Sequence, residues 1–315
     1  MRHITATFIA LGMLIGGAAG VAHGQAWTQS EGHTYLKVAY GAATASEQYA
    51  FDGQLKLYAD DVYAPAFFDR SVYLYGEVGL TDRLTLVAAM PYKRVIVRDL
   101  GFRYETAALG DLELGARWSL LPWLAWLPES AAAAVNVRAT LPTFYTRNLL
   151  PAPGRGQVDL AATVDYGQGF GLGFLGAAYA QVGAGYRMHT PWYGLSNAAA
   201  CQPGQDRGCT VDQQSDPGDE IVARAELGAR PWSPLLLQGL SEAVVSLRAP
   251  SVGFSASEPA PTSQRYLKVG VGVEVTPLPH IALSAQAFAT PWGRNTVRSV
   301  DLFVGLSTDF SLWER

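Results

Sequence analysis

Charged side chains recur at every second position in two stretches of the sequence. Within residues 111–120, Asp111, Glu113 and Arg117 share one face and apolar residues share the other, and residues 220–229 repeat the pattern. A period of two is that of a β-strand, so these acids and arginines lie in a row. Such a row could form cross-strand ion pairs or bind a solute. It is too polar for a protein core, and the opposite face is too apolar for water.

Other expected strands continue this charged face. Taking the charged side of each strand as inward gives these lumen-lining candidates: Lys37, Glu77, Asp111, Glu113, Arg117, Arg138, Asp159, Asp165, Arg187, Arg224, Glu226, Arg248, Lys268, Glu274 and Asp301. The two signs are nearly balanced, whereas an ion-selective filter would carry a ring of one sign. Two interpretations remain: a salt-bridge network that keeps a narrow barrel rigid, and a lining that binds solute. Arg117 and Arg138 would flank a space on adjacent strands that Glu113 could neutralise.

Aromatic residues that follow prolines mark the expected outer ends of the strands. The candidates for contact with an apolar solute are Tyr92, Phe144, Tyr145, Trp192, Tyr193, Phe254 and Trp292. Proline ends strand pairing, and tryptophan and tyrosine suit the headgroup level of a membrane, so an aromatic girdle is one explanation. Capture of an apolar solute by external loops is the other.

The two cysteines, Cys201 and Cys209, lie in a stretch rich in Pro, Gly, Gln and Asp. In an exported protein this spacing suggests a disulfide within one loop. A zinc site is the weaker idea, because zinc needs about four ligands and no histidine follows closely in the sequence. We therefore expect neither a metal nor another cofactor.

The histidines bear on catalysis, because outer-membrane lipid hydrolases use a serine with a histidine base. His33, His189 and His280 are each followed by residues that do not give the His-x-Ser arrangement of those enzymes. We therefore expect no enzyme. A structural or adhesive barrel without a transport role is a further alternative, and a lipid hydrolase is the least favoured one.

Strands must position all of these side chains. The alternation predicts an all-β fold, a transmembrane antiparallel up-and-down β-barrel of about twelve strands, because a closed barrel leaves no unpaired edge in lipid. The expected strands are 34–42, 70–80, 84–90, 110–120, 132–141, 157–166, 174–189, 219–230, 242–249, 265–276, 280–289 and 298–310. Long connections are expected outside the membrane, at 43–69, 91–109, 142–156, 190–218, 250–264 and 290–297. Shorter ones are expected at 81–83, 121–131, 167–173, 231–241 and 277–279.

The first residues have the features of a secretory signal peptide. A basic start and an apolar run from Ile4 to about Val21 precede a small-residue cleavage site. We therefore expect a signal peptide over 1–26, Sec-type export, and an outer-membrane barrel over 27–315. The later sequence lacks the run of roughly 18 apolar residues that a membrane helix needs. The net charge of −4, without long runs of one sign, argues against a nucleic-acid partner.

Three short motifs resemble a known family. They are residues 75–86 (YGEVGLTDRLTL), residues 110–118 (GDLELGARW) and the pair Leu141-Pro142. The combination is similar to the outer-membrane proteins named for the meta-cleavage pathway of phenol degradation. The resemblance implies a bacterial outer-membrane barrel that transports small hydrophobic or aromatic compounds, with no catalytic residues. Its expected partners are the lipid bilayer, the barrel assembly machinery during biogenesis, and a small hydrophobic solute.

Overall fold

The computed structural model describes residues 25–57, 66–99, 102–146, 149, 151–173, 176–190, 218–248 and 263–313. Most of these residues lie in strands, and no helix among them combines the length and the apolar character needed to cross a membrane. The expected signal peptide and the disulfide between Cys201 and Cys209 fall largely or wholly outside these residues, so both stay predictions.

The strands follow one another along the chain. They are β1 (His33–Tyr49), β2 (Leu55–Leu57), β3 (Phe67–Thr81), β4 (Leu84–Asp99), β5 (Phe102–Leu109), β6 (Leu112–Ser119), β7 (Ala131–Leu141), β8 (Asp159–Gly171), β9 (Ala177–His189), β10 (Glu220–Trp232), β11 (Leu235–Ser246), β12 (Arg265–Leu278), β13 (Ile281–Arg294) and β14 (Thr296–Ser311). A short 3-10 helix, Leu121–Trp123, lies between β6 and β7.

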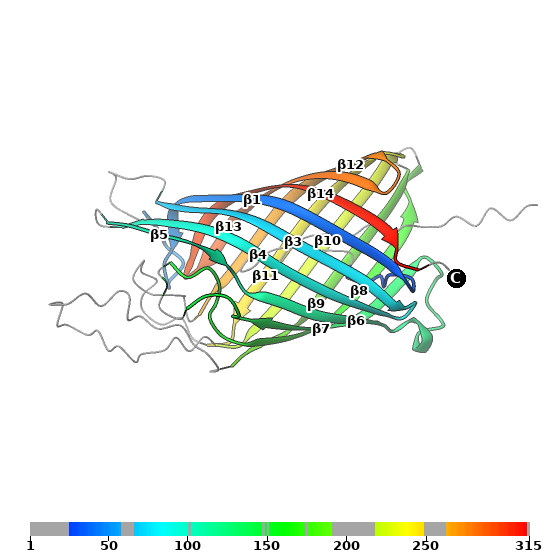
Figure 1. Cartoon of the computed structure of the whole chain (residues 1–315), viewed down its shortest axis with the longest axis horizontal. Coiled ribbons are helices and arrows are strands. Elements are labelled where there is room, and N and C mark those ends of the chain that lie inside the picture. Colours follow the sequence, from blue (N-terminus) through cyan, green and yellow to red (C-terminus); the bar gives the residue numbers. More distant parts are fainter. Residues whose placement is uncertain are drawn as a thin grey trace, which may run out of the picture.

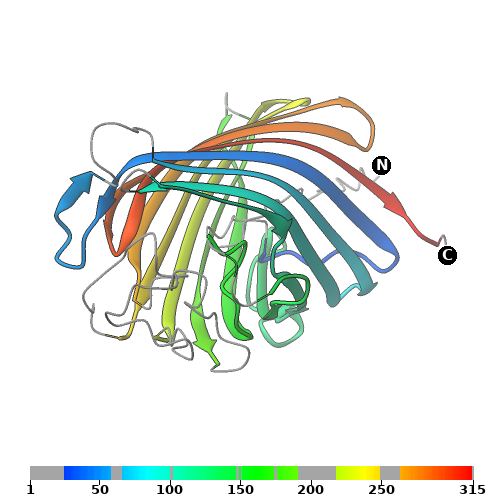
Figure 2. The same cartoon turned by 60° about the vertical axis from the view of Figure 1, so that its left-hand side comes forward.

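These strands form one antiparallel sheet that closes on itself (Figures 1 and 2). Neighbours in sequence pair side by side, and β14 returns to pair with β1 from His33↔Ser311 to Tyr49↔Thr296. Of the 14 strands in the described residues, β2 and β5 only extend the wall at one end, so 12 strands make the closed barrel. The predicted all-β antiparallel barrel of about twelve strands is confirmed.

The two faces of each strand differ in the way that a membrane barrel requires. In β1, Tyr35 and Lys37 point inward and are 2% exposed, whereas Leu36 and Val38 point outward and are 44% and 50% exposed. The same alternation recurs in β14, where Val300, Leu302, Val304 and Leu306 are all exposed. An outer band of aliphatic side chains around a polar interior suits a wall surrounded by lipid.

The strand β4 extends through a proline that we expected to end it. The sequence predicted a strand end at Met90 and a loop over 91–109, but β4 continues to Asp99 and that loop contains β5. Pro91 lies where β4 changes partner from β6 to β5, and its carbonyl accepts a hydrogen bond from the Gly110 N–H at 2.7 Å. The N–H and C=O of a strand residue point to the same side, so the missing proline N–H falls at this junction and interrupts no regular pairing.

Further expected connections are also wrong. Residues 43–49 belong to β1, residues 55–57 form β2, and residues 167–171 belong to β8. The stretch 231–241 is mostly strand, because β10 continues to Trp232 and β11 begins at Leu235. The stretch 290–297 is mostly strand as well, with Asn295 alone between β13 and β14 at a φ of 49°. Asparagine tolerates this left-handed conformation better than most residues. Pro291 is accommodated at a register shift between β12 and β13, the kind of irregularity where proline is found in sheets.

One side of the barrel interior is filled by packed side chains. The cluster consists of Tyr35, Ala39, Tyr73, Tyr75, Val87, Ala89, Leu240, Phe288 and Phe303. The Phe303 ring lies 5.9 Å from the Tyr73 ring and 6.0 Å from the Phe288 ring, centroid to centroid. Gly41 lies beneath two of these rings, because a Cβ there would come within 2.7 Å of Phe303 and 2.8 Å of Tyr73. The rings therefore require a residue without a side chain in β1.

Gly41→Val is expected to lower the free energy of unfolding by about 2 kcal/mol, because the new side chain would push both rings out of their packing. The measurement is denaturant unfolding of the refolded protein in lipid vesicles. Gly239→Val is the matched control, since nothing lies within 4 Å of a Cβ built on that strand glycine. Equal stability of the two variants would show that the cluster does not depend on Gly41.

Candidate functional site

The segment of residues 25–31 leads from the barrel interior, where Gln25 and Ala26 are buried, to the rim at the β3–β4 turn, ahead of β1 (Figure 2). We call it the N-terminal segment. Its main chain is held by side chains of the wall: Asn136 Nδ2 donates to the Gln25 carbonyl at 3.0 Å, and Arg117 Nη1 donates to the Trp27 carbonyl at 2.8 Å. The N-terminal segment therefore occupies the part of the lumen next to the short turns, where β1 begins.

The Trp27 ring fits closely against the wall. It meets the Tyr179 ring edge-on with centroids 6.0 Å apart, and a Cβ at Gly167 would lie only 2.2 Å from its ring. Sequence reasoning did not place this segment in the lumen. It is a short polar stretch without strand periodicity, so its position depends on side chains far away in the chain.

A buried ion pair anchors the N-terminal segment. Arg117 and Glu77 are 1% and 2% exposed, with Nη2–Oε1 and Nη1–Oε2 distances of 2.8 Å and 3.2 Å. Arg117 Nε also donates to Asn136 Oδ1 at 3.1 Å, and Gln29 Nε2 donates to Glu77 Oε2 at 2.8 Å. Pairing of β4 with β6 sets Arg117 opposite the small residue Thr85, which lets the arginine reach across β4 to the β3 carboxylate.

This pairing corrects the expected role of Glu113. We expected Glu113 to neutralise the space between Arg117 and Arg138, but Arg117 is neutralised by Glu77. Glu113 instead lies 3.9 Å from Arg138, beyond hydrogen-bond distance. The sequence shows which residues share a face, but the partner across two strands follows from the register.

A second segment enters the barrel at the opposite, long-loop end. It belongs to the connection between β7 and β8, of which residues 142–146, 149 and 151–158 are described, and we call it the inner loop. The Tyr145 hydroxyl donates to Asp111, and it accepts from the Gly156 N–H at 2.7 Å. The Arg155 N–H donates to Asp111 Oδ2 at 2.8 Å. These bonds hold the loop against the wall at the junction of β5 and β6.

Arg155 joins a cluster of charged side chains at this end. Its Nη1 donates to Glu220 Oε2 at 3.2 Å, and Arg187 Nη1 donates to the same oxygen at 2.8 Å. His189 bridges the acids, with Nδ1 2.7 Å from Asp159 and Nε2 3.3 Å from Glu220. Burial alone would lower the pKa of the Arg155 guanidinium, but the carboxylates of Glu220 and Asp159 raise it above its usual value. Arg155 therefore stays charged inside the barrel.

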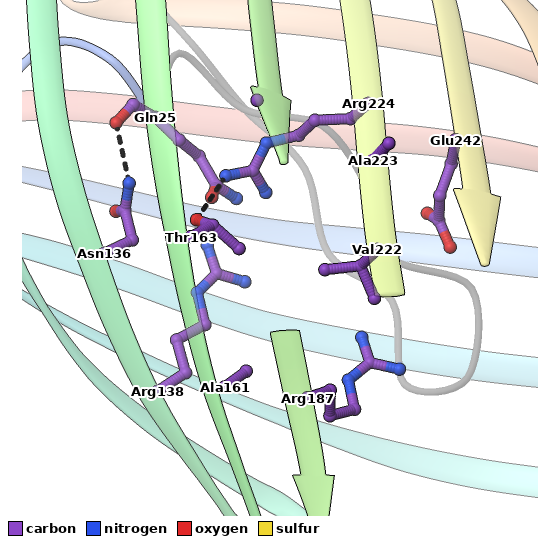
Figure 3. A pocket seen from close by; sticks show the side chains of 11 residues that line it. Gln25, Asn136, Arg138, Ala161, Thr163, Arg187, Val222, Ala223, Arg224 and Glu242 are labelled. Atoms are coloured by element: carbon purple, nitrogen blue, oxygen red, sulfur yellow. Dashed lines mark hydrogen bonds between the residues drawn. The ribbon is translucent and has the colours of Figure 1, made fainter. Parts of the chain in front are cut away.

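A cavity in the lumen lies beside the N-terminal segment, and Gln25 forms part of its lining. Its lining also includes Arg138, Ala161, Arg187, Val222, Arg224 and Glu242. Figure 3 shows side chains from several neighbouring strands turned toward this space. The cavity thus has a cationic wall and one carboxylate.

Most of the predicted lumen residues point inward. Buried or half-buried on the inner face are Lys37, Glu77, Glu113, Arg117, Arg138, Asp159, Asp165, Arg187, Arg224, Glu226, Lys268, Glu274 and Asp301. Lys268 pairs with Asp301 at 2.5 Å, one of several cross-strand pairs among them. Arg248 is an exception, because β11 ends at Ser246 and the arginine lies exposed beyond the strand. That the inward residues contact a solute stays a prediction.

The aromatic residues expected to contact an apolar solute lie in different environments. Tyr92 and Trp292 were expected in external loops, but they lie within β4 and β13 and are 49% and 46% exposed. Tyr145 is buried by its bonds in the inner loop, while Phe144 beside it is 53% exposed. The remaining three, Trp192, Tyr193 and Phe254, lie outside the described residues.

Searches against protein-family models and characterised proteins give no match to this sequence. Among solved structures, the chain is similar to the crystal structure of an outer membrane channel from Pseudomonas putida F1. The TM-score is 0.70 at 16% identity, over 92% of this chain and 100% of that one. The NanC porin has a TM-score of 0.48 at 7% identity, covering 87% of this chain and 98% of its own. The CymD monoaromatic hydrocarbon channel has a TM-score of 0.40 at 8% identity, covering 91% and 90%. The fold is thus that of an outer-membrane β-barrel.

Proposed function

We propose that this protein is a channel of the bacterial outer membrane that transports small hydrophobic or aromatic compounds. The observation that carries the proposal is the cavity inside a closed barrel with an apolar outer face. The N-terminal segment narrows the lumen at one end and the inner loop narrows it at the other. A lumen narrowed in this way would admit small solutes and exclude large ones.

Aromatic side chains support the choice of solute. Phe144 is half exposed next to the inner loop's contacts with the wall, where an apolar compound could first bind. The packed rings of Tyr73, Phe288 and Phe303 give one part of the interior an aromatic surface, whereas the arginines give another part a charged one. The resemblance to the phenol meta-pathway family, which stays a prediction, agrees with this choice.

Single-channel recording tests the proposal. The refolded, heat-modifiable protein in a planar bilayer is expected to give small ohmic current steps that phenol or toluene reduces. Phe144→Ala is expected to weaken this block, because it removes the exposed ring beside the inner loop. Trp292→Ala is the matched control, since that ring lies in a strand and is about equally exposed.

Two outcomes would contradict different parts of the proposal. Steady current that no aromatic compound changes would remove the aromatic solute class. Absence of both current and solute uptake into vesicles would remove the channel and favour a structural or adhesive barrel.

A lipid hydrolase is not supported by the histidine best placed for catalysis. The histidine base of such an enzyme needs one ring nitrogen that is free to accept a proton from a serine. In His189, Nδ1 contacts Asp159 and Gln157, and Nε2 contacts Glu220 and Arg155. Both nitrogens are therefore engaged within the charged cluster.

A further inference from the structure

We propose that the lumen cavity binds the carboxylate of a small organic acid through Arg138, Arg187 and Arg224. This inference rests on the proposed channel and narrows its solute to aromatic or apolar acids. The neutral compounds considered above would then be weaker ligands of the same cavity.

The three arginines reach the cavity from three strands. Strand register places Arg138 of β7 opposite Ala161 of β8, and Ala161 opposite Arg187 of β9. Arg224 of β10 lies opposite Gly183 of β9. Because only small residues lie between them, the guanidinium groups share one space (Figure 3). Like charges so arranged repel one another unless carboxylates of the protein or a bound anion compensate them.

Buried carboxylates hold two of these arginines from behind. Arg224 Nε and Nη2 donate to Asp165 Oδ1 at 2.8 Å and 2.6 Å, and Asp165 is fully buried. Arg187 Nη1 donates to Glu220 Oε2 at 2.8 Å. A guanidinium has five N–H donors in a fixed plane, so such bonds fix its orientation and leave other donors available. A side chain held in place in this way loses less freedom when it binds a ligand.

Arg138 is the arginine with the clearest unmet bonding capacity. Its Nη2 is buried, and within the described part of the chain it has no hydrogen-bond partner. The nearby Glu113 carboxylate is 3.9 Å from Nη1, too far for a hydrogen bond. A buried donor without an acceptor costs free energy. An anion that accepts a hydrogen bond from Arg138 would therefore gain more binding free energy than it would at an arginine whose donors are all bonded.

The rest of the cavity lining favours an organic acid over a simple anion. Ala161 and Val222 form an apolar part of the wall close to the arginines. An inorganic ion would leave this surface unused, whereas the body of an aromatic acid would cover it. A carboxylate also matches the planar fork of arginine, which can donate two parallel bonds to it. Glu242 lies on the same cavity and would disfavour a second negative charge.

Titration calorimetry with the full chain refolded in detergent tests the site. Benzoate is the probe, benzyl alcohol is its neutral counterpart, and inorganic phosphate is the simple anion. Benzoate is expected to bind at least tenfold more tightly than benzyl alcohol or phosphate. Arg138→Gln is expected to weaken benzoate binding roughly tenfold or more, the effect of losing a hydrogen bond to a charged group. Arg298→Gln is the control, because that arginine is half exposed and pairs with Glu47 elsewhere on the barrel.

The outcomes separate this inference from the proposed function. Equal binding of benzoate and benzyl alcohol, or benzoate binding unchanged by Arg138→Gln in a correctly folded barrel, would overturn the carboxylate site and leave an aromatic channel standing. Phosphate binding as tight as benzoate would overturn the organic acid in favour of a simple anion site. Wild-type protein that binds no probe would overturn the carboxylate site, and the current recordings would decide separately whether the barrel is a channel.

Discussion

Replacement of Arg117 with alanine is expected to lower the free energy of unfolding by about 3–5 kcal/mol, the usual effect of leaving one charge of a buried pair without its partner. Glu77 is 2% exposed at its side chain, and its other bonds, from Tyr75 and Gln29, cannot replace a positive charge. The variant also loses the bond from Arg117 to the Trp27 carbonyl, so the N-terminal segment is expected to loosen.

Unfolding by denaturant in lipid vesicles measures this effect. Arg298→Ala removes a pair with Glu47 of similar length, 2.7 Å, but both side chains are 40% or more exposed. Such pairs contribute about 1 kcal/mol or less, so this control is expected to stay close to wild type. The double variant Arg117→Ala with Glu77→Gln is expected to recover part of the loss, because no uncompensated charge remains. An Arg117→Ala barrel as stable as the Arg298→Ala barrel would contradict the argument.

Removal of residues 25–31 is expected to raise the single-channel conductance severalfold. The first of these residues lie inside the barrel and all of them precede the first strand, so the wall can close without them. Two chains should be refolded and compared, one beginning at Gln25 and the other at Gly32. The conductance is expected to rise because removal of the segment leaves a wider, water-filled path next to the short turns.

The matched control keeps the N-terminal segment and weakens a single contact. Gln29→Ala loses the bond to Glu77 but leaves the main-chain bonds at Gln25 and Trp27, so its conductance is expected to stay near that of the longer chain. Heat modifiability on a gel shows that each barrel has formed. Equal conductance of the two chain lengths would mean that the inner loop, and not this segment, limits the current.

Alternation alone predicted most of the barrel wall. β6, β7, β12 and β14 lie within a few residues of their expected ranges, because each has a charged or small inner face and an apolar outer face. β5 was missed because Pro91 was taken as a strand end. A proline ends a strand where its missing N–H would have bonded to a neighbouring strand. It need not do so at a position where the strand changes from one neighbour to another.

Less of the candidate site could be predicted from the sequence. Inward residues such as Arg138 and Arg224 could be identified, since facing follows from a period of two. Their partners could not, because the Arg117–Glu77 pair joins β6 to β3 across an intervening strand. Arg155 was missed for another reason. It lies in a loop without periodicity, and only the fold of that loop brings it to Glu220.

The pairing of β1 with β14 has a consequence for how the molecule forms. It joins His33 to Ser311, so the last contact to complete the wall links opposite ends of the chain. Contacts of such high sequence separation slow folding, because the entropy of closing the loop is lost before the contact forms. Until β14 exists, β1 and β13 each present a row of unpaired N–H and C=O groups that lipid cannot satisfy. Closure of the ring is therefore expected to be the late step, and a chain interrupted before β14 would have two open edges ready to pair with other chains.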